Sequence, residues 1–283
     1  MLTLCTSLAP QLGRRDEDGH ECGMSYQQEC IEGWMQLGAK VVAVNVAEEL
    51  QWAHRTFPKV GLIPAPADSR SHNNGRPLPY IHDLVQAAAV QAERQYCGVI
   101  NSDIYLRDFD RHWPSIEPLL TGGLVVMRRM EMSWPSQTAK GIYPFGFDVF
   151  LMDRRMGAVI PESPFAVGIP WWDFWLPLMG FLKGFNVHLV QTPIAYHLEH
   201  PAKWDQAQFI EYGAQLVAYL ELEAKKACET PALKGRGTFL LDGLRLVRET
   251  AECDTRNLKY TSALSRYLQW FFDEGNAVNR AVL

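Results

Sequence analysis

The sequence lacks the features that mark membrane-spanning, disulfide-built and zinc-binding proteins. Its longest stretch without Asp, Glu, Lys or Arg runs from Gly184 to Leu198 and contains polar residues, whereas about 20 apolar residues are needed to cross a bilayer. Its six cysteines include no CxxC pair, so neither a disulfide framework nor a structural zinc site is expected. The first residues have no basic segment or long apolar run, so we expect a cytoplasmic protein.

Positive charge is also scarce. The 27 Lys and Arg residues are outnumbered by 32 Asp and Glu residues, which gives a net charge of −5. This balance argues against a nucleic-acid-binding protein that relies on a basic face. No P-loop, GxSxG, HExxH or kinase signature is present. The abundant Trp and Phe residues leave a peripheral association with the inner membrane open.

Strand-like and helix-like segments alternate in the first half of the chain. We expect strands at residues 2–7, 41–46, 60–64 and 97–100, and helices at 25–37, 48–57 and 80–96. Strands that alternate with helices over short links indicate βαβ units. The expected fold class is therefore α/β, with a mostly parallel, Rossmann-type sheet flanked by helices.

The second half of the chain ends in helices. Further strands are expected at residues 123–127, 148–152 and 187–190, and helices at 206–229, 239–252 and 258–274, with a linker at 231–237. We therefore predict a catalytic domain over residues 1–204 and a helical extension over residues 205–283 that packs on it. The extension also offers a surface for a homodimer.

Polar residues gather where the predicted strands end. Thr6 and Ser7 end the first strand, Glu48 follows the second, and Asn101-Ser102-Asp103 follows the fourth. Ligands of parallel α/β sheets bind beyond the carboxyl ends of the strands. A carboxylate such as Asp103 could hold a divalent metal against a diphosphate leaving group. The alternative is that Asp103 only caps a turn.

A cluster of Trp residues surrounds a second carboxylate. Asp173 follows Trp171 and Trp172, where sugar rings could stack and where a carboxylate could take a proton from an acceptor hydroxyl. Asp148 could bind acceptor hydroxyls. The alternatives are a core role for the Trp residues, a helix N-cap at Asp173 and a turn at Asp148.

Two histidines lie near the end of the last predicted strand. His197 and His200 are three residues apart, and each could ligate a metal or contact a phosphate. This spacing is a weak motif, because many surface histidine pairs share it.

Taken in order along the chain, these segments resemble glycosyltransferases of the GT-A type. More narrowly, they are similar to a group of bacterial and plant glycosyltransferase-like proteins, and the resemblance covers roughly residues 1–205. The matching pieces are Gly33-Trp34 within Ser25–Gly38, then Val41–Glu48, Val99–Ile104, Gly146–Phe150, Gly168–Leu176 and Ala195–His200. Their order is more specific than any single piece.

The resemblance implies a GT-A-like fold and a nucleotide-diphosphate sugar as the donor. The segment Asn101-Ser102-Asp103 stands where such enzymes carry the DxD motif, so that Asp103 matches its metal-binding Asp and Asn101 replaces its first Asp. Ser102 lies between them and is expected to bind the nucleotide sugar as well. The strand ends at Thr6, Ser7 and Glu48 match regions that contact the nucleoside.

The resemblance also implies roles on the acceptor side. Asp173 matches the position of the general base in inverting members, and His197 or His200 matches a histidine that completes a site for Mn²⁺ or Mg²⁺. The implied activity is transfer of a sugar to a hydroxyl of a glycan, a lipid-linked saccharide or a protein, as in polysaccharide biosynthesis.

Two other functions remain open at this point. A sugar nucleotidyltransferase can use a similar sheet and metal site, but it usually carries a Gly-rich loop and a basic residue after the first strand, and Ser7–Gly13 is a poor match. A catalytically degenerate GT-A-like domain that binds a glycan or a partner would explain why Asn101 replaces an Asp.

Overall fold

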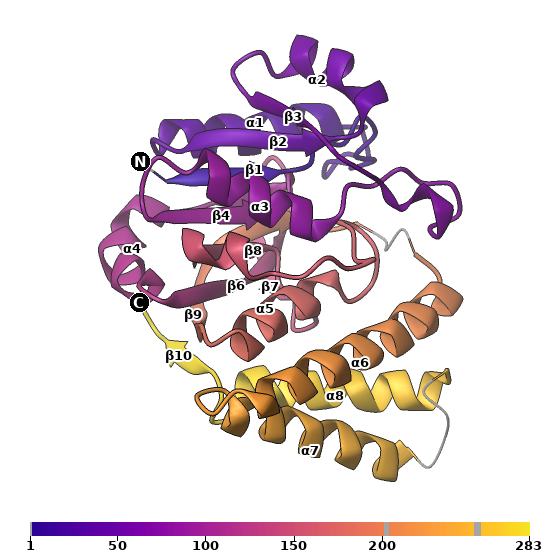
Figure 1. Cartoon of the computed structure of the whole chain (residues 1–283). Coiled ribbons are helices and arrows are strands. Elements are labelled where there is room, and N and C mark those ends of the chain that lie inside the picture. Colours follow the sequence, from indigo (N-terminus) through magenta and orange to yellow (C-terminus); the bar gives the residue numbers. More distant parts are fainter. Residues whose placement is uncertain (1, 201–203, 252–255) are drawn as a thin grey trace.

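A computed structural model describes residues 2–200, 204–251 and 256–283 (Figure 1). Its strands are β1 (Thr3–Thr6), β2 (Lys40–Asn45), β3 (Gly61–Pro64), β4 (Tyr96–Ile100), β5 (Ile104–Leu106), β6 (Gly123–Met132), β7 (Ala139–Ile142), β8 (Val149–Asp153), β9 (Asn186–Leu198) and β10 (Asn279–Ala281). Its helices are α1 (Gly23–Gln36), α2 (Leu50–Thr56), α3 (Ile81–Gln91), α4 (Phe109–Ile116), α5 (Trp172–Leu182), α6 (Gln206–Glu229), α7 (Lys234–Ala251) and α8 (Leu258–Asp273).

The strands form one mixed sheet in the order β10-β9-β6-β8-β4-β1-β2-β3, with β5 paired to β9 and β7 paired to β6. The strands β1 to β4 pair in parallel, as do β6, β9 and β10. Only β8 separates these two parallel groups, and it runs antiparallel to β4 and β6. The expected α/β class with a mostly parallel, Rossmann-type sheet is confirmed.

Alternate side chains of the central strands point to opposite faces of the sheet, as the period of two in a strand requires. In β1, Cys5 joins the core beneath α3 and α5, whereas Leu4 joins the core beneath α1 and α4. In β8, Phe150 belongs to the same core as Cys5, and Leu151 belongs to the same core as Leu4. Because both faces are covered, these strands read in the sequence as continuous apolar runs.

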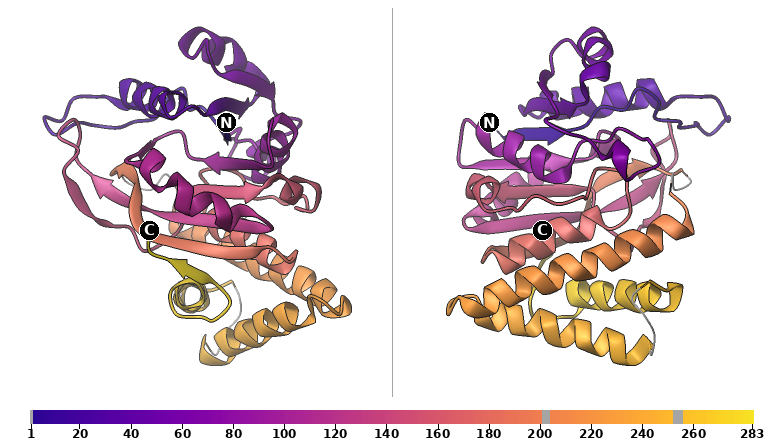
Figure 2. Two further views of the ribbon diagram at one scale, coloured as in Figure 1. Left: turned by 90° about the vertical axis from the view of Figure 1, so that its left-hand side faces the viewer. Right: turned by 45° about the vertical axis from the view of Figure 1, so that its right-hand side comes forward.

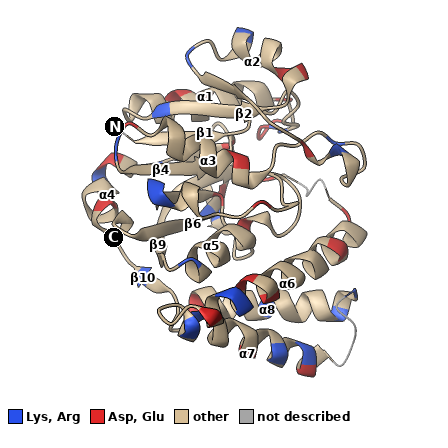
Figure 3. Ribbon diagram, in the orientation of Figure 1, with Lys and Arg blue, Asp and Glu red and all other residues tan. Residues whose placement is uncertain are grey.

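The last three helices lie along one side of the molecule, beneath α5 (Figure 2). α6 packs on α5, and α7 and α8 pack on α6, so their apolar residues belong to the same core as α5 and one face of the sheet. The division at residue 204 stays a prediction. Charged residues of both signs are interspersed along α6 and α7 (Figure 3). No helix among the described residues is both long and apolar enough to cross a membrane.

Several element boundaries differ from those expected. The helix α1 begins at Gly23, two residues before the expected start at residue 25. The predicted linker 231–237 is shorter, since α7 begins at Lys234. The strand expected at 187–190 continues to Leu198. Residue 252, the predicted end of the helix from 239, lies outside the described residues.

Phe272 anchors α8 to the rest of the molecule, and its removal should destabilise the protein. The side chain is fully buried, and its ring centroid lies 4.8 Å from that of Phe147. Phe272→Ala is expected to lower the free energy of unfolding by about 3–5 kcal/mol, measured by urea denaturation. Leu246→Ala on α7, where the side chain is 59% exposed, should change it by less than about 0.5 kcal/mol. Equal effects of both variants would contradict the packing described here.

Candidate active site

The polar strand ends meet at one edge of the sheet, where the strand order reverses between β1 and β4. In open α/β sheets, this reversal opens a crevice beyond the carboxyl ends of the strands. Here the crevice is a cavity of about 1450 Å³, lined by the loops after β1 and β4, the end of β9 and the start of α5. Asn101, Ser102, Asp103, Asp148 and Asp173 all line it.

Asp103 is buried and paired with two cationic groups. Its Oδ2 accepts a hydrogen bond from the Arg14 guanidinium, which is 3% exposed, and lies 3.3 Å from Nε2 of His197. Burial alone would raise the pKa of Asp103, but the charges of His197, Arg14 and His200 hold it well below its usual range. Oδ1 accepts no hydrogen bond from the described residues, so it is the oxygen left for a ligand.

Strand pairing brings His197 to this carboxylate. β5 runs antiparallel to β9 with Ile104 opposite His197, so the residue before Ile104 lies beside the histidine. Tyr26 of α1 ties the two segments together, because its hydroxyl donates to the carbonyl of Asp103 at 3.0 Å and accepts from the Leu198 amide at 3.1 Å.

A network of ion pairs forms the charged floor of the cavity. It joins Arg14, Asp103, His197, Glu131, Arg129 and Asp148. Nδ1 of His197 lies 2.9 Å from Glu131, whose other oxygen accepts from Arg129 at 2.8 Å. Arg129 also donates to Asp148 at 2.9 Å. Asp148 in turn accepts a hydrogen bond from the side-chain amide of Asn101. Asn101 lies two residues before Asp103 in the sequence, so the network ends close to where it begins. Asn101 therefore holds Asp148.

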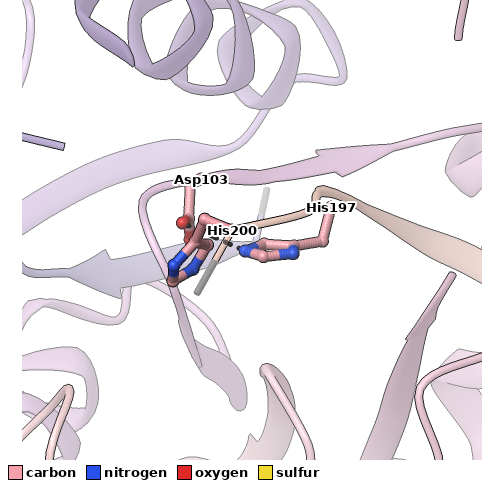
Figure 4. A group of neighbouring side chains, drawn as sticks. All are labelled: Asp103, His197 and His200. Atoms are coloured by element: carbon pink, nitrogen blue, oxygen red, sulfur yellow. Dashed lines mark ion pairs between the residues drawn. The ribbon is translucent and has the colours of Figure 1, made fainter. Parts of the chain in front are cut away.

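Asp103, His197 and His200 form a group that could hold a metal ion (Figure 4). One donor atom from each lies within 4.8 Å of the others, which matches an ion about 2.0–2.6 Å from each ligand. The donor set fits a divalent cation, with Oδ1 of Asp103 as the available oxygen. A second group, Asp16, Asp18 and His20, has the same kind of ligands but lies away from the cavity.

Asp173 lies in the first turn of α5, and two unusual backbone positions place it there. Trp171, which precedes α5, has a φ of 74°, and its indole donates to the carbonyl of Phe209 in α6 at 2.8 Å. Gly146 has a φ of 115° and lies so close to the Asp173 carboxylate that a Cβ there would clash with it. Burial, and next the charge of Asp148, raise the pKa of Asp173 to about 7.

The Trp residues beside Asp173 are mainly core residues. Trp171 is 4% exposed and stacks on Phe209, and Trp172 is 5% exposed and packs against Phe150. Both are nevertheless among the residues that line the cavity. Phe145, which is 50% exposed and also lines the cavity, offers a larger free ring face. The role of Trp171 and Trp172 in acceptor binding stays a prediction.

The donor-side residues lie at different distances from the cavity. Ser7 and Ser102 line it, and Ser102 accepts a hydrogen bond from Gln27 at 3.2 Å. Thr6 is fully buried in β1, outside the lining. Glu48 is exposed and paired with Arg70, whereas the adjacent Glu49 lines the cavity. The nucleotide-binding roles of these residues stay predictions.

The sequence did not point to Arg14 and Glu131 of the charged floor. Arg14 lies in an irregular loop, and Arg129 and Glu131 alternate with apolar residues near the end of β6. An alternating Arg-x-Glu at the carboxyl end of a predicted strand is the one local signal that could have indicated them. Arg14 has no such signal, because its partner Asp103 is far away in the sequence.

Solved structures with the same architecture exist despite very low sequence identity. Residues 1–349 of S. aureus TarS in complex with UDP-GlcNAc superpose with a TM-score of 0.54 at 10% identity, covering 99% of this chain and 84% of that chain. A longer S. aureus TarS structure gives a TM-score of 0.50 at 12% identity, covering 98% and 50%. The chain therefore has a GT-A-like fold, and the expected resemblance to GT-A glycosyltransferases is confirmed at the level of the fold.

No protein-family model matches the chain, and no curated protein matches its sequence. The correspondence of Asn101-Ser102-Asp103 to a DxD motif accordingly stays a prediction.

Gly146 should be essential for the geometry of Asp173. Gly146→Ala places a Cβ against the Asp173 carboxylate in a backbone conformation that L residues disfavour, so we expect a loss of more than about 1 kcal/mol in the free energy of unfolding. Thermal and urea denaturation measure it. Gly141→Ala is the matched control, because that glycine is exposed and nothing lies within 4 Å of a Cβ there. If Gly146→Ala is as stable as Gly141→Ala, the close approach is wrong.

Proposed function

We propose that the protein is a glycosyltransferase that moves a sugar from a nucleotide-diphosphate donor to an acceptor hydroxyl. One observation carries this proposal. A group suited to a divalent cation, at Asp103, and a carboxylate with a pKa near neutrality, Asp173, face the same cavity at the switch point of a GT-A-like sheet. The TarS structure of similar fold contains UDP-GlcNAc, which supports a nucleotide sugar as the donor class.

On the donor side, Asp103, His197 and His200 would hold a divalent cation, with His197 as a neutral ring that ligates through Nε2 and keeps its Nδ1 proton on Glu131. When bound, the cation neutralises the charge that builds up on the departing diphosphate. The mixed oxygen and nitrogen ligands favour Mn²⁺ over Mg²⁺, because Mg²⁺ prefers oxygen ligands. Arg14 pairs with Asp103 and adds a further positive charge at the cavity wall. Ser7 and Ser102 present hydroxyls to the nucleotide.

On the acceptor side, Asp173 acts as the general base. It takes the proton of the acceptor hydroxyl while the hydroxyl oxygen attacks the anomeric carbon and the bond from that carbon to the diphosphate breaks. A base works best when its pKa lies near the working pH, and burial beside Asp148 gives Asp173 such a pKa. Asp148 is itself engaged by Arg129 and Asn101, so its role is to tune and support the base.

A sugar nucleotidyltransferase is the second candidate, and one observation favours it. Arg14 follows Gly13 in the loop after β1 and lines the cavity, where such enzymes need a basic residue. Release of pyrophosphate from a nucleoside triphosphate and a sugar phosphate would establish this activity. Release of a nucleoside diphosphate from a nucleotide sugar establishes the glycosyltransferase.

The metal ligands can be tested by direct binding of Mn²⁺. His200→Ala should weaken the binding of Mn²⁺, measured by electron paramagnetic resonance, by at least about tenfold, since even outer-shell partners of a metal contribute a factor of that size. His54→Ala, at an exposed histidine on α2 outside both candidate metal groups, is the matched control and should leave the affinity unchanged. Equal binding by wild type and His200→Ala would exclude this metal site.

The base can be tested by the pH dependence of transfer. Activity requires the ionised carboxylate, so kcat/KM should rise with pH and level off above about 7, the pKa of Asp173. Asp173→Asn should lower kcat by about 10²–10⁴-fold and leave binding of the nucleotide sugar unchanged. Asp110→Asn, an exposed carboxylate on α4, serves as the control. Full activity in Asp173→Asn would remove Asp173 as the base.

The same variant has a second readout that does not depend on catalysis. Because the pKa of Asp173 is raised in the folded protein, its ionisation costs stability progressively as the pH rises from about 4 to 7. Asp173→Asn removes this cost, so its stability relative to wild type should increase over that range. A constant difference would contradict the raised pKa.

A further inference from the structure

The polar face of α8 forms a wall of the cavity that the proposed donor and base sites do not use. Ser262, Ser265, Arg266 and Gln269 line the cavity and recur at the spacing of one helix face. The opposite face of α8, with Leu264, Leu268, Phe271 and Phe272, is fully buried in the core. The polar residues of α8 therefore face the same space as Asp103 and Asp173.

Packing fixes this wall next to the candidate base. Phe272 contacts the rings of Phe147 and Phe174, with centroid distances of 4.8 and 6.0 Å. Phe147 directly precedes Asp148, and Phe174 directly follows Asp173. The end of α8 is also tied to β6, since Asp273 and Arg128 form an ion pair at 2.6 Å. The α8 wall thus lies on the acceptor side of the cavity.

The charges of the cavity are unevenly distributed. The floor carries the carboxylates of Asp103, Glu131 and Asp148, whose partners Arg14 and Arg129 are already engaged. Arg266 is exposed, and among the described residues no ion pair or hydrogen bond engages its guanidinium. Arg266 is therefore a cation of the cavity wall that can pair with an anionic group of a ligand.

The size of the cavity leaves room for a ligand beyond the donor. Its volume of about 1450 Å³ exceeds the roughly 300–1,000 Å³ of most small-molecule sites. The half-exposed ring of Phe145 offers an apolar face in the same cavity, and the hydroxyl and amide groups of α8 match the hydroxyls of a saccharide.

We propose that α8 and Phe145 form an acceptor subsite for a saccharide that bears an anionic group, a carboxylate or a phosphate, bound by Arg266. This inference rests on the proposed function and adds the class of acceptor. Phe145 stacks on a sugar ring, Ser262, Ser265 and Gln269 bind hydroxyls, and the guanidinium of Arg266 binds the anionic group through paired N–H donors.

The test compares charged and neutral saccharides of matched length. Binding of hexameric oligogalacturonate and its carboxyl-reduced neutral form, and of 6-phosphorylated and plain maltohexaose, is measured by calorimetry with the full chain. At least one anionic form should bind about tenfold or more tightly than its neutral counterpart, the factor that one charge-assisted hydrogen bond supplies. The pair with the larger difference identifies the anionic group as a carboxylate or a phosphate.

Variants connect this preference to α8. Arg266→Gln should abolish the preference for the anionic form without changing binding of the neutral one, and Arg266→Lys should retain part of it. Arg245→Gln on α7, which is 70% exposed and pairs with Asp242, is the matched control and should behave as wild type. An undiminished preference in Arg266→Gln, or no preference in wild type, overturns the proposal.

A parallel titration with UDP and GDP, each with Mn²⁺, separates this inference from the proposed function. Nucleotide binding in wild type together with no saccharide preference removes the subsite alone. A preference that depends on Arg266 in a protein that binds neither nucleotide supports the subsite and removes the glycosyltransferase.

Discussion

The candidate site depends on the burial of the Asp103 carboxylate between Arg14 and His197. An ionised carboxylate that leaves water costs several kcal/mol unless cationic groups and hydrogen bonds compensate it. The partners come from the loop after β1 and from β9, so the pairing fixes three distant segments at one point. Glu131 and Asp148 need cationic partners for the same reason, and they share Arg129. Glu131 also pairs with His197, so the ion pairs form one connected network.

The two ends of the cavity tune their carboxylates in opposite directions. Cationic neighbours lower the pKa of Asp103, whereas burial beside another carboxylate raises that of Asp173. Carboxylates whose environments separate their pKa values in this way suit different tasks. A permanently ionised Asp103 suits the binding of a cation, and an Asp173 that titrates near neutral pH suits the transfer of protons.

The sequence predicted those parts of the molecule that have a local pattern. The β-branched run at residues 41–46 and the polar end of β4 at Asn101 were recognisable, because buried strands and their carboxyl ends leave such patterns. β9 was predicted too short, since Thr192 and Pro193 interrupt its apolar run. The pairing of Arg14 with Asp103 joins segments far apart in the sequence, and no local pattern encodes it.

The contribution of α8 to the cavity has a consequence for the synthesis of the protein. The residues on the charged floor all precede residue 200, whereas α8 is synthesised after them. A nascent chain can form the sheet and its floor while one wall of the cavity is still missing. Phe147 and Phe174 then lack the partner that covers them. The complete cavity therefore forms only after α8 has been made and has packed against Phe147 and Phe174.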